Sequence, residues 1–284
     1  MQKSTEALVQ LIETVHRLRA PGGCPWDRAQ THQSLRQYLI EEAYEVLDVL
    51  DQINKTEDLA REEIKNPFRE ELGDLLMQVL LHSEMASETG AFDFNEVAAG
   101  LNDKLIRRHP HVFGDQKADS AETAFQHWEK QKAKEKLTKP DSSILDGMPK
   151  GLPALQRAGR VLEKVTKVGF QWKDMKGPLD KVDEELRELK AEVLALEKDP
   201  AKSDAQRSKV EAELGDLFFS LCNVAYLVKI SPEDALRSTM ARFESRFRHV
   251  ELKLREQGKT PDQSTLEEMD VFWDDAKRKE SEKR

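Results

Sequence analysis

Carboxylate residues stand at spacings that would bring like charges together on a helix. Glu-Glu-x-x-Glu occupies positions 41–45, and Glu-x-x-Asp follows at 71–74. Residues three and four apart are neighbours on a helix, and like charges so placed destabilise it by roughly 0.2–0.5 kcal/mol per pair. If the two helices run antiparallel, the acids face each other across a groove. Such hard oxygen ligands suit Mg²⁺ or Mn²⁺, which in proteins typically carry substrate phosphates.

The acidic pattern occurs twice. Glu-Glu-x-x-Glu recurs at 184–188, offset by 143 residues, and Glu-x-x-Asp recurs at 213–216, offset by 142. Other features repeat in the same order: Trp26 with Trp172, Lys104 and Arg108 with Arg242 and Arg246, and Trp128 and Lys132 with Trp273 and Lys277. Repetition in one order at nearly constant offset indicates a duplicated domain.

The elements that position these residues are predicted to be helices. Apolar residues recur at helical spacing over 8–18, 35–49, 72–85 and 97–106, and again in the second half, with no convincing alternating strand. Charged residues make up 35% of the chain and aromatic residues 6%, which favours amphipathic helices over a β-sandwich. Helix starts are expected near Asp93 and at Ser231-Pro232. We therefore predict an all-α fold of tandem duplicated helical bundles.

The helix that carries Glu71 and Asp74 is expected to lie inside its bundle, because Leu72 and its apolar neighbours flank the acids. Gly73, enclosed by the two acids, costs about 1 kcal/mol against alanine in mid-helix, and Gly215 repeats it. The repeated glycine predicts a close approach of a second helix.

Helix-breaking residues divide the two halves. Pro140, Gly147, Pro149, Gly151 and Pro153 fall within one short stretch. We therefore predict a first helical domain over 1–137, a linker over 138–153 and a second helical domain over 154–284.

Composition excludes several classes of protein. The net charge of −9 disfavours nucleic acid as a partner. Two cysteines indicate neither a disulfide framework nor a cysteine-rich zinc site. The N-terminus lacks a secretory signal pattern, and no window approaches the roughly 18 apolar residues of a membrane helix. A cytoplasmic protein is expected.

The order and spacing of the acidic motifs resemble those of the MazG nucleotide pyrophosphohydrolases, among them the two-domain bacterial members. The motifs are separated by residues 46–70 in the first copy and 189–212 in the second. Further matches are 23–27, 107–113, 169–172 and 242–248. The resemblance implies an all-α, usually dimeric, Mg²⁺-dependent enzyme that converts a nucleoside triphosphate and water to a nucleoside monophosphate and pyrophosphate.

The same resemblance assigns roles to the acids. The leading residues Glu41 and Glu184 are expected to orient or deprotonate the attacking water. The expected metal ligands are Glu42, Glu45, Glu71 and Asp74 in the first half, and Glu185, Glu188, Glu213 and Asp216 in the second.

Negative charge on the phosphates needs cationic partners as well. Trp273 is interpreted either as a ring that stacks on the nucleobase or as a helix anchor. The second half has the fuller set of cationic and aromatic residues, which slightly favours it as the main site. The first half nevertheless matches this set position by position. The predicted substrate-binding residues are Lys104, Arg108, Trp128, Lys132, Arg242, Arg246, Trp273 and Lys277.

Several alternatives remain open. A di-iron bundle would need Glu-x-x-His on two helices, whereas both acidic motifs end in Asp. His109 and His111 are interpreted as part of a helix-terminating turn rather than as metal ligands, and Cys24 is not favoured as a nucleophile. A hydrolase restricted to one nucleotide such as dUTP, and a partly degenerate dimerisation or regulatory module with an unknown protein partner, are the remaining alternatives. A symmetric homodimer is expected.

Overall fold

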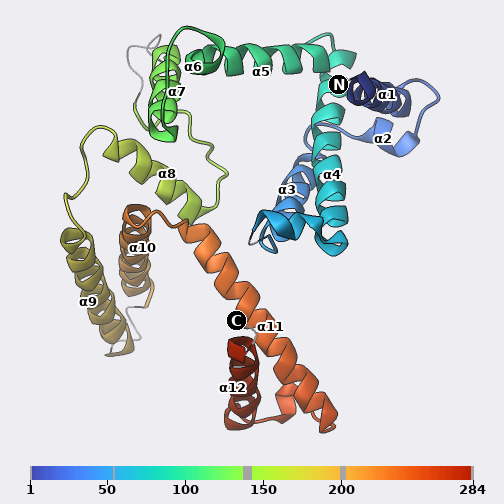
Figure 1. Cartoon of the computed structure of the whole chain (residues 1–284). Coiled ribbons are helices and arrows are strands. Elements are labelled where there is room, and N and C mark those ends of the chain that lie inside the picture. The colour runs from blue at the N-terminus through green and yellow to red at the C-terminus, as the bar shows by residue number, and fades with distance from the viewer. Residues whose placement is uncertain (1, 54, 137–142, 199–202, 283–284) are drawn as a thin grey trace. The chain divides into compact units, whose positions relative to one another are not determined.

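Every regular element in the described part of the chain is a helix (Figure 1). The computed structural model describes residues 2–53, 55–136, 143–198 and 203–282. The predicted all-α fold is confirmed. The chain divides into two compact units, Met1–Pro140 and Asp141–Arg284. Of the predicted linker, 138–142 lie outside the described residues, and 143–153 contain no helix.

The first unit is built around one long helix, α4 (Glu62–Glu88), which packs against α1, α3 and α5. Its hydrophobic core joins Val15, Leu35, Leu80, Leu81 and Met85. The remaining elements are α1 (Gln2–Arg19), α2 (Pro25–Ala29), α3 (Arg36–Leu50), the 3₁₀ helix η1 (Thr56–Ala60), α5 (Phe94–Arg108), α6 (Pro110–Phe113) and α7 (Ala121–Lys136).

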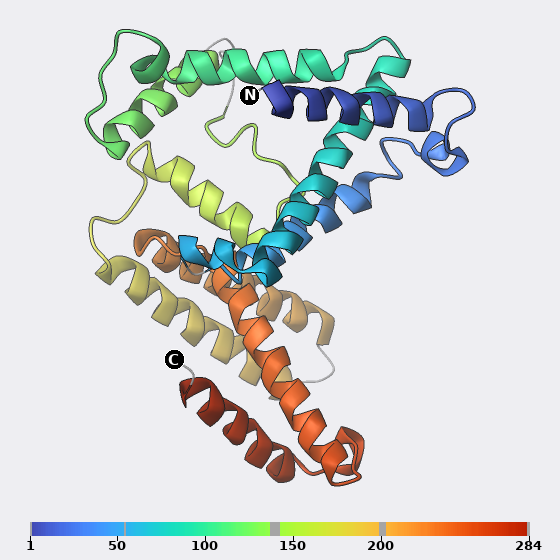
Figure 2. The ribbon, with the colours of Figure 1, turned by 45° about the vertical axis from the view of Figure 1, so that its right-hand side comes forward.

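The second unit has a corresponding long helix, α10 (Ser203–Leu227), which packs against α8, α9 and α11 (Figure 2). Its buried apolar side chains include Leu162, Cys222, Val250, Leu254 and Ala276. The other elements are α8 (Ala154–Thr166), α9 (Lys176–Lys198), α11 (Pro232–Glu256), the 3₁₀ helix η3 (Pro261–Gln263) and α12 (Leu266–Glu282).

Local sequence signals set several helix boundaries. Asp93 caps α5, accepting a hydrogen bond from the backbone N–H of Glu96 at 2.9 Å, and the Ser231 side chain caps α11, where Pro232 is the first helical residue. The predicted helix starts are confirmed. The predicted turn at His109 is also confirmed, because α5 ends at Arg108 and the short α6 begins at Pro110.

The acidic helices are less enclosed than predicted. Leu72 is 44% exposed and Leu214 is 38% exposed. A Cβ added at Gly73 or Gly215 would meet nothing within 4 Å. The prediction that these glycines admit a neighbouring helix is therefore wrong within the described chain, because no element of the same unit covers this face.

One further property of the helices concerns length and hydropathy. Among the described residues, no single helix is long and apolar enough to cross a membrane, and one sharply bent pair, 204–227 with 232–256, meets both requirements only when taken together.

Candidate metal centres and substrate-binding residues

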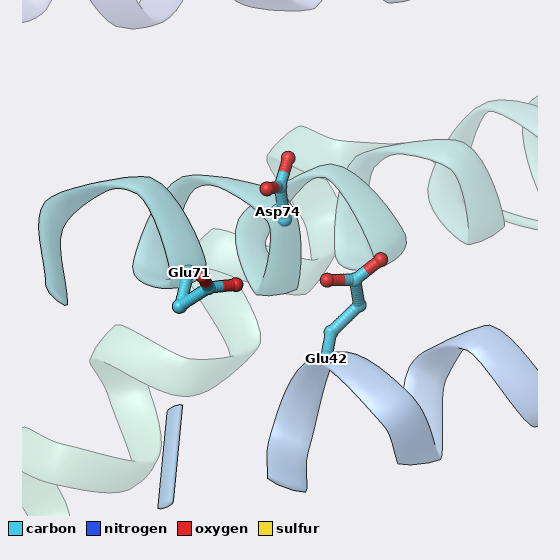
Figure 3. A group of neighbouring side chains, drawn as sticks. All are labelled: Glu42, Glu71 and Asp74. Atoms are coloured by element: carbon cyan, nitrogen blue, oxygen red, sulfur yellow. The ribbon is translucent and has the colours of Figure 1, made fainter. Parts of the chain in front are cut away.

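The first carboxylate cluster lies between α3 and α4, which pack against each other. Glu42 reaches from α3 toward Glu71 and Asp74 on α4 (Figure 3). One carboxylate oxygen of each of these three residues lies within 4.8 Å of the other two. Glu45, one turn after Glu42, lies close enough for its charge to act on both Glu42 and Glu71. All four predicted ligands of the first half therefore meet.

This cluster holds negative charge that no basic side chain neutralises within the described residues. Burial, Asp74 and Glu45 raise the pKa of Glu42 above its ordinary value. Burial, Glu45 and Asp74 likewise raise the pKa of Glu71. Desolvation and neighbouring like charges both disfavour an ionised carboxylate, and a bound divalent cation would reverse both effects.

The second unit repeats the cluster on α9 and α10. Glu185, only 4% exposed, belongs to two acidic groups, one with Glu184 and Glu188 and one with Glu213 and Asp216. Burial raises the pKa of Glu213, as do the charges of the neighbouring acids. The four predicted ligands of the second half are thus also brought together.

A lysine distinguishes the second cluster from the first. Lys181 Nζ lies 2.7 Å from a Glu184 oxygen and 2.5 Å from a Glu185 oxygen. Hydrogen bonding to these carboxylates raises the pKa of Lys181, and the same contact lowers the pKa of Glu184. Tyr38 stands at the corresponding position of the first unit, offset by 143 residues. The second cluster is therefore partly neutralised by the protein itself.

A buried glutamine distinguishes the first cluster. Gln78 is 2% exposed and hydrogen-bonds to Glu42, which opposes the rise in the pKa of that carboxyl. Its Oε1 is buried without a hydrogen-bond partner in the structure. Sequence reasoning missed Gln78, although its place one turn after Asp74 was a usable signal. Ser220 takes the corresponding position in the second unit.

The predicted leading acids lie in different surroundings. Glu41 is exposed on α3 and belongs to no acidic group that could hold a metal within the described chain. Glu184 belongs to the second cluster and is bonded to Lys181.

The cations of the first unit gather around a tryptophan between α5 and α7. The Arg108 guanidinium carbon lies 5.3 Å from the centre of the Trp128 ring, and Lys132 Nζ lies 4.5 Å from it. Arg108 donates a 2.5 Å hydrogen bond from Nη2 to Glu135. The Glu135 carboxylate therefore holds the Arg108 guanidinium through a hydrogen bond, and the Trp128 ring contacts it through a cation–π interaction.

The second unit repeats this arrangement between α11 and α12. The Arg246 guanidinium carbon lies 5.6 Å from the Trp273 ring centre, and its Nη2 donates to Glu280 at 2.7 Å. Sequence reasoning missed Glu135 and Glu280. Each follows its tryptophan by seven residues, so the repeated Trp-x-x-x-Lys-x-x-Glu pattern could have revealed both.

The other predicted cations make only local contacts. Arg242 hydrogen-bonds to Ser238 and Thr239 on its own helix, and Lys277 pairs with Asp274. Lys104, on α5, makes no hydrogen bond or ion pair with the described residues.

The clustered cations lie on helices that extend away from the acids of the same unit. We call α5–α7 the first arm and α11–α12 the second arm. The first arm leaves the end of α4 that is remote from α3, and α12 packs beside the part of α11 remote from α10 (Figure 1). Within the described residues, no cation of either arm forms an ion pair with a predicted metal ligand. The structure brings acids together and cations together, but in separate places of each unit.

A pocket of about 270 Å³ adjoins the second acidic cluster, between α8, α9 and α10. Glu185 and Asp216 lie on its wall, as do Phe170 and Trp172. A Cβ at Gly177 would overlap the Trp172 ring, so this glycine lets the ring lie against the start of α9. Acids and aromatic rings on one wall suit a ligand with a charged part and a flat apolar part.

These features define a class: a duplicated all-α protein in which pairs of helices present carboxylate clusters able to hold divalent metal ions. Residues 30–113 match the MazG nucleotide pyrophosphohydrolase domain. The chain belongs to the MazG nucleotide pyrophosphohydrolase family, an enzyme family, as its similarity to whole relatives also shows.

Three relatives illustrate this similarity. The nucleoside triphosphate pyrophosphohydrolase/pyrophosphatase MazG of Thermotoga maritima is 41% identical over 94% of both chains. The nucleoside triphosphate pyrophosphohydrolase of Escherichia coli K12 is 40% identical over 95% of this chain and 97% of its own. The uncharacterized protein YabN of Bacillus subtilis is 42% identical over 94% of this chain, which matches 50% of that longer protein.

Proposed function

We propose that the chain hydrolyses nucleoside triphosphates to nucleoside monophosphates and pyrophosphate, with Mg²⁺ bound at its acidic clusters. The observation that carries this proposal is the pair of carboxylate clusters, each formed between two neighbouring helices. The family and the names of the relatives support the same reaction.

The residues present fit a hard divalent cation. Three carboxylates of the first unit converge without a basic partner within the described chain, and burial together with the neighbouring acids raises the pKa values of Glu42 and Glu71. We assign metal binding to Glu42, Glu45, Glu71 and Asp74, and to Glu185, Glu188, Glu213 and Asp216 in the second unit. When bound, Mg²⁺ polarises phosphate oxygens and lowers the pKa of coordinated water; Mn²⁺ offers the same chemistry.

The protein's own groups orient the reactants. Gln78 lies against Glu42 and opposes the rise in its pKa, and we assign to Gln78 the role of orienting this carboxylate. We assign to Glu184, a member of the second cluster, the role of accepting a proton from the attacking water, and the corresponding role in the first unit to Glu41. Attack at the α-phosphorus then releases pyrophosphate, whose charge requires cationic partners.

The second unit offers a place for the nucleoside. The pocket beside Glu185 and Asp216 presents the rings of Phe170 and Trp172. An aromatic wall next to a metal centre suits a nucleobase linked to phosphates. We therefore propose that the second unit is a catalytic site, and that the first unit retains a complete metal cluster.

We further propose that the chain works as a homodimer. Its accessible surface is 20704 Å². Two compact domains of half its mass would together expose about 15,000 Å². The excess of about 5,700 Å² per chain is more than one partner of an obligate dimer typically buries, so it leaves ample surface for such an interface. Exposed apolar side chains beside the acids, such as Leu72 and Phe218, support a partner on this face.

In this dimer, we propose that the cations of an arm serve the carboxylates of the second copy. The arms point away from the acids of their own unit, whereas phosphates must contact metal and cations together. Arg108, Trp128 and Lys132 in the first arm, and Arg246, Trp273 and Lys277 in the second, are the proposed substrate-binding groups, with Lys104 and Arg242 on the same arms.

The first experiment measures pyrophosphate release from the eight common ribo- and deoxyribonucleoside triphosphates with Mg²⁺. Wild type is compared with Glu45→Ala, Glu188→Ala and the double variant. We expect equal amounts of monophosphate and pyrophosphate from wild type and none from the double variant. If no triphosphate is hydrolysed, the proposed function is wrong; if only dUTP is hydrolysed, the enzyme is restricted to one nucleotide.

A further inference from the structure

The pocket of the second unit contains two amide side chains that the hydrolysis of phosphates does not require. Asn223, on α10, is 4% exposed, and Gln171 lies in the loop before α9. Gln171 Nε2 donates a 2.8 Å hydrogen bond to Asn223 Oδ1. Both residues line the pocket beside the acidic cluster.

The direction of this amide pair is set by the backbone. The Trp172 backbone N–H donates to Gln171 Oε1 at 2.9 Å. A backbone N–H is always a donor, so Gln171 must present its oxygen there and its nitrogen toward Asn223. Asn223 must then accept through Oδ1, since the reverse assignment would leave the Trp172 N–H facing another donor.

The consequence is a fixed hydrogen-bond donor in the pocket. With Oδ1 engaged, Asn223 offers Nδ2. This nitrogen has no hydrogen-bond partner within the described residues, and the Asn223 side chain lines the pocket. The side chain of Asn223 is more than nine-tenths buried, so water reaches its donor poorly. A ligand that supplies an acceptor therefore gains binding free energy from this hydrogen bond.

We propose that Asn223, oriented by Gln171, selects nucleobases that present a keto oxygen over those that present an amino group at the same position. This inference rests on the proposed function. A keto oxygen accepts from Nδ2, whereas an exocyclic amino group would place two donors face to face. The selection belongs to the second unit: Leu81 and Pro25 stand at the corresponding positions of the first unit, and Leu81 is 3% exposed.

The test uses substrate pairs that differ at this position of the base. ITP and ATP carry keto and amino groups at purine position 6, and UTP and CTP do so at pyrimidine position 4. The full chain is studied in a Glu45→Ala background, so that only the second cluster is complete. We expect kcat/KM to favour the keto member of each pair by about tenfold or more, because an unpaired buried donor is a strong penalty.

Two variants of Asn223 separate polarity from shape. Asn223→Leu introduces the residue of the first unit and should bring the keto-to-amino ratio close to one. Asn223→Asp keeps the acceptor for Gln171 but replaces the donor, and at pH 8.5 it should favour the amino member. Gln171→Ala, which releases the orientation of Asn223, should also lower the ratio. Melting temperatures establish that each variant is folded.

Binding is measured separately from turnover. Calorimetry with IMP and AMP should show the same preference in the same variants. A wild-type ratio near one, or a ratio that Asn223→Leu leaves unchanged, overturns the inference while leaving the proposed hydrolysis intact. Absence of pyrophosphate release from every triphosphate overturns the proposed function instead, and equal affinity for IMP and AMP then overturns the inference as well.

Discussion

Glu71 illustrates what it costs to gather carboxylates at the proposed metal site. Its pKa is raised by burial and by the charges of Glu45 and Asp74. A carboxyl whose pKa is raised by folding destabilises the folded state at neutral pH, where it is ionised, and this cost disappears as pH falls through the raised pKa. A divalent cation removes the same cost by binding the charge.

We therefore predict that Glu71→Gln stabilises the metal-free protein at pH 7.5, raising the melting temperature by about 1–2 °C. This gain should shrink as the pH is lowered, because the wild-type carboxyl becomes protonated at a higher pH in the folded protein than in the unfolded chain. Mg²⁺ should raise the melting temperature of wild type more than that of the variant. Calorimetric melting with and without Mg²⁺ tests both effects, and a destabilised variant at pH 7.5 would contradict the assigned pKa direction.

The residues of the acidic clusters were readable from the sequence because their helical spacing and duplication are properties of the sequence itself. Lys181 lies one turn before Glu184 and Glu185, and Gln78 lies one turn after Asp74, so spacing could have revealed both. The contacts of Gln78 and Asn223 could not be predicted, because their neighbours are distant in sequence: Gln78 on α4 meets Glu42 on α3, and Asn223 on α10 meets Gln171 before α9. A buried polar residue in an apolar pattern shows that a partner is needed, but the pattern does not identify the partner.

At the scale of elements, each arm contains an arginine–carboxylate pair that links its two long helices beside the tryptophan. Glu135 keeps a pKa of about 2 beside Arg108 and Arg107, so it is ionised at neutral pH. Arg246 and Glu280 repeat this pair. The carboxylate and the tryptophan together restrict the guanidinium and reduce the conformational entropy it would lose on binding phosphate.

We predict that Glu280→Gln raises KM for the triphosphate by about tenfold with a smaller change in kcat, because the arginine becomes less ordered before the substrate binds. Steady-state kinetics in the Glu45→Ala background measure the effect. Glu256→Gln is the matched control, since Glu256 pairs with Lys253 on the same arm away from the tryptophan. A lower KM in Glu280→Gln would instead mean that the carboxylate competes with phosphate.

Most helices followed from periodicity and capping residues, as at Asp93 and Ser231. The surroundings of the acidic helices did not follow. Leu72 and Gly73 indicated a covered face, yet the unit leaves that face open. Periodicity shows that a face is apolar, but the same pattern arises whether another helix of the chain or a second copy covers it.

At the scale of the whole molecule, many large apolar side chains are exposed. Phe218 and Phe243, 50% and 57% exposed, lie on a helix of the second acidic cluster and on an arm. We predict a dimer by sedimentation at micromolar concentration. Phe218→Asp should shift it toward monomer, because a charge buried in an apolar interface is costly. A wild-type monomer with full activity would contradict the proposed dimer.

Complementation tests the shared site directly. One inactive chain carries Glu45→Ala and Glu188→Ala, and the other carries Arg108→Ala and Arg246→Ala. Mixing them with exchange of subunits should restore up to about one quarter of wild-type activity, because half of the dimers are mixed and half of their sites are intact. If each unit used its own arm, the mixture would stay inactive.

In the proposed dimer, the separation of the arms from the acids would link catalysis to the amount of protein present. A site completed by a second copy exists only in the associated state, so well below the dissociation constant activity rises with the square of total concentration. Dilution would then act as an off switch that needs no separate inhibitor. Substrate that contacts both copies favours association, so the enzyme would be most sensitive to dilution when its nucleotides are scarce.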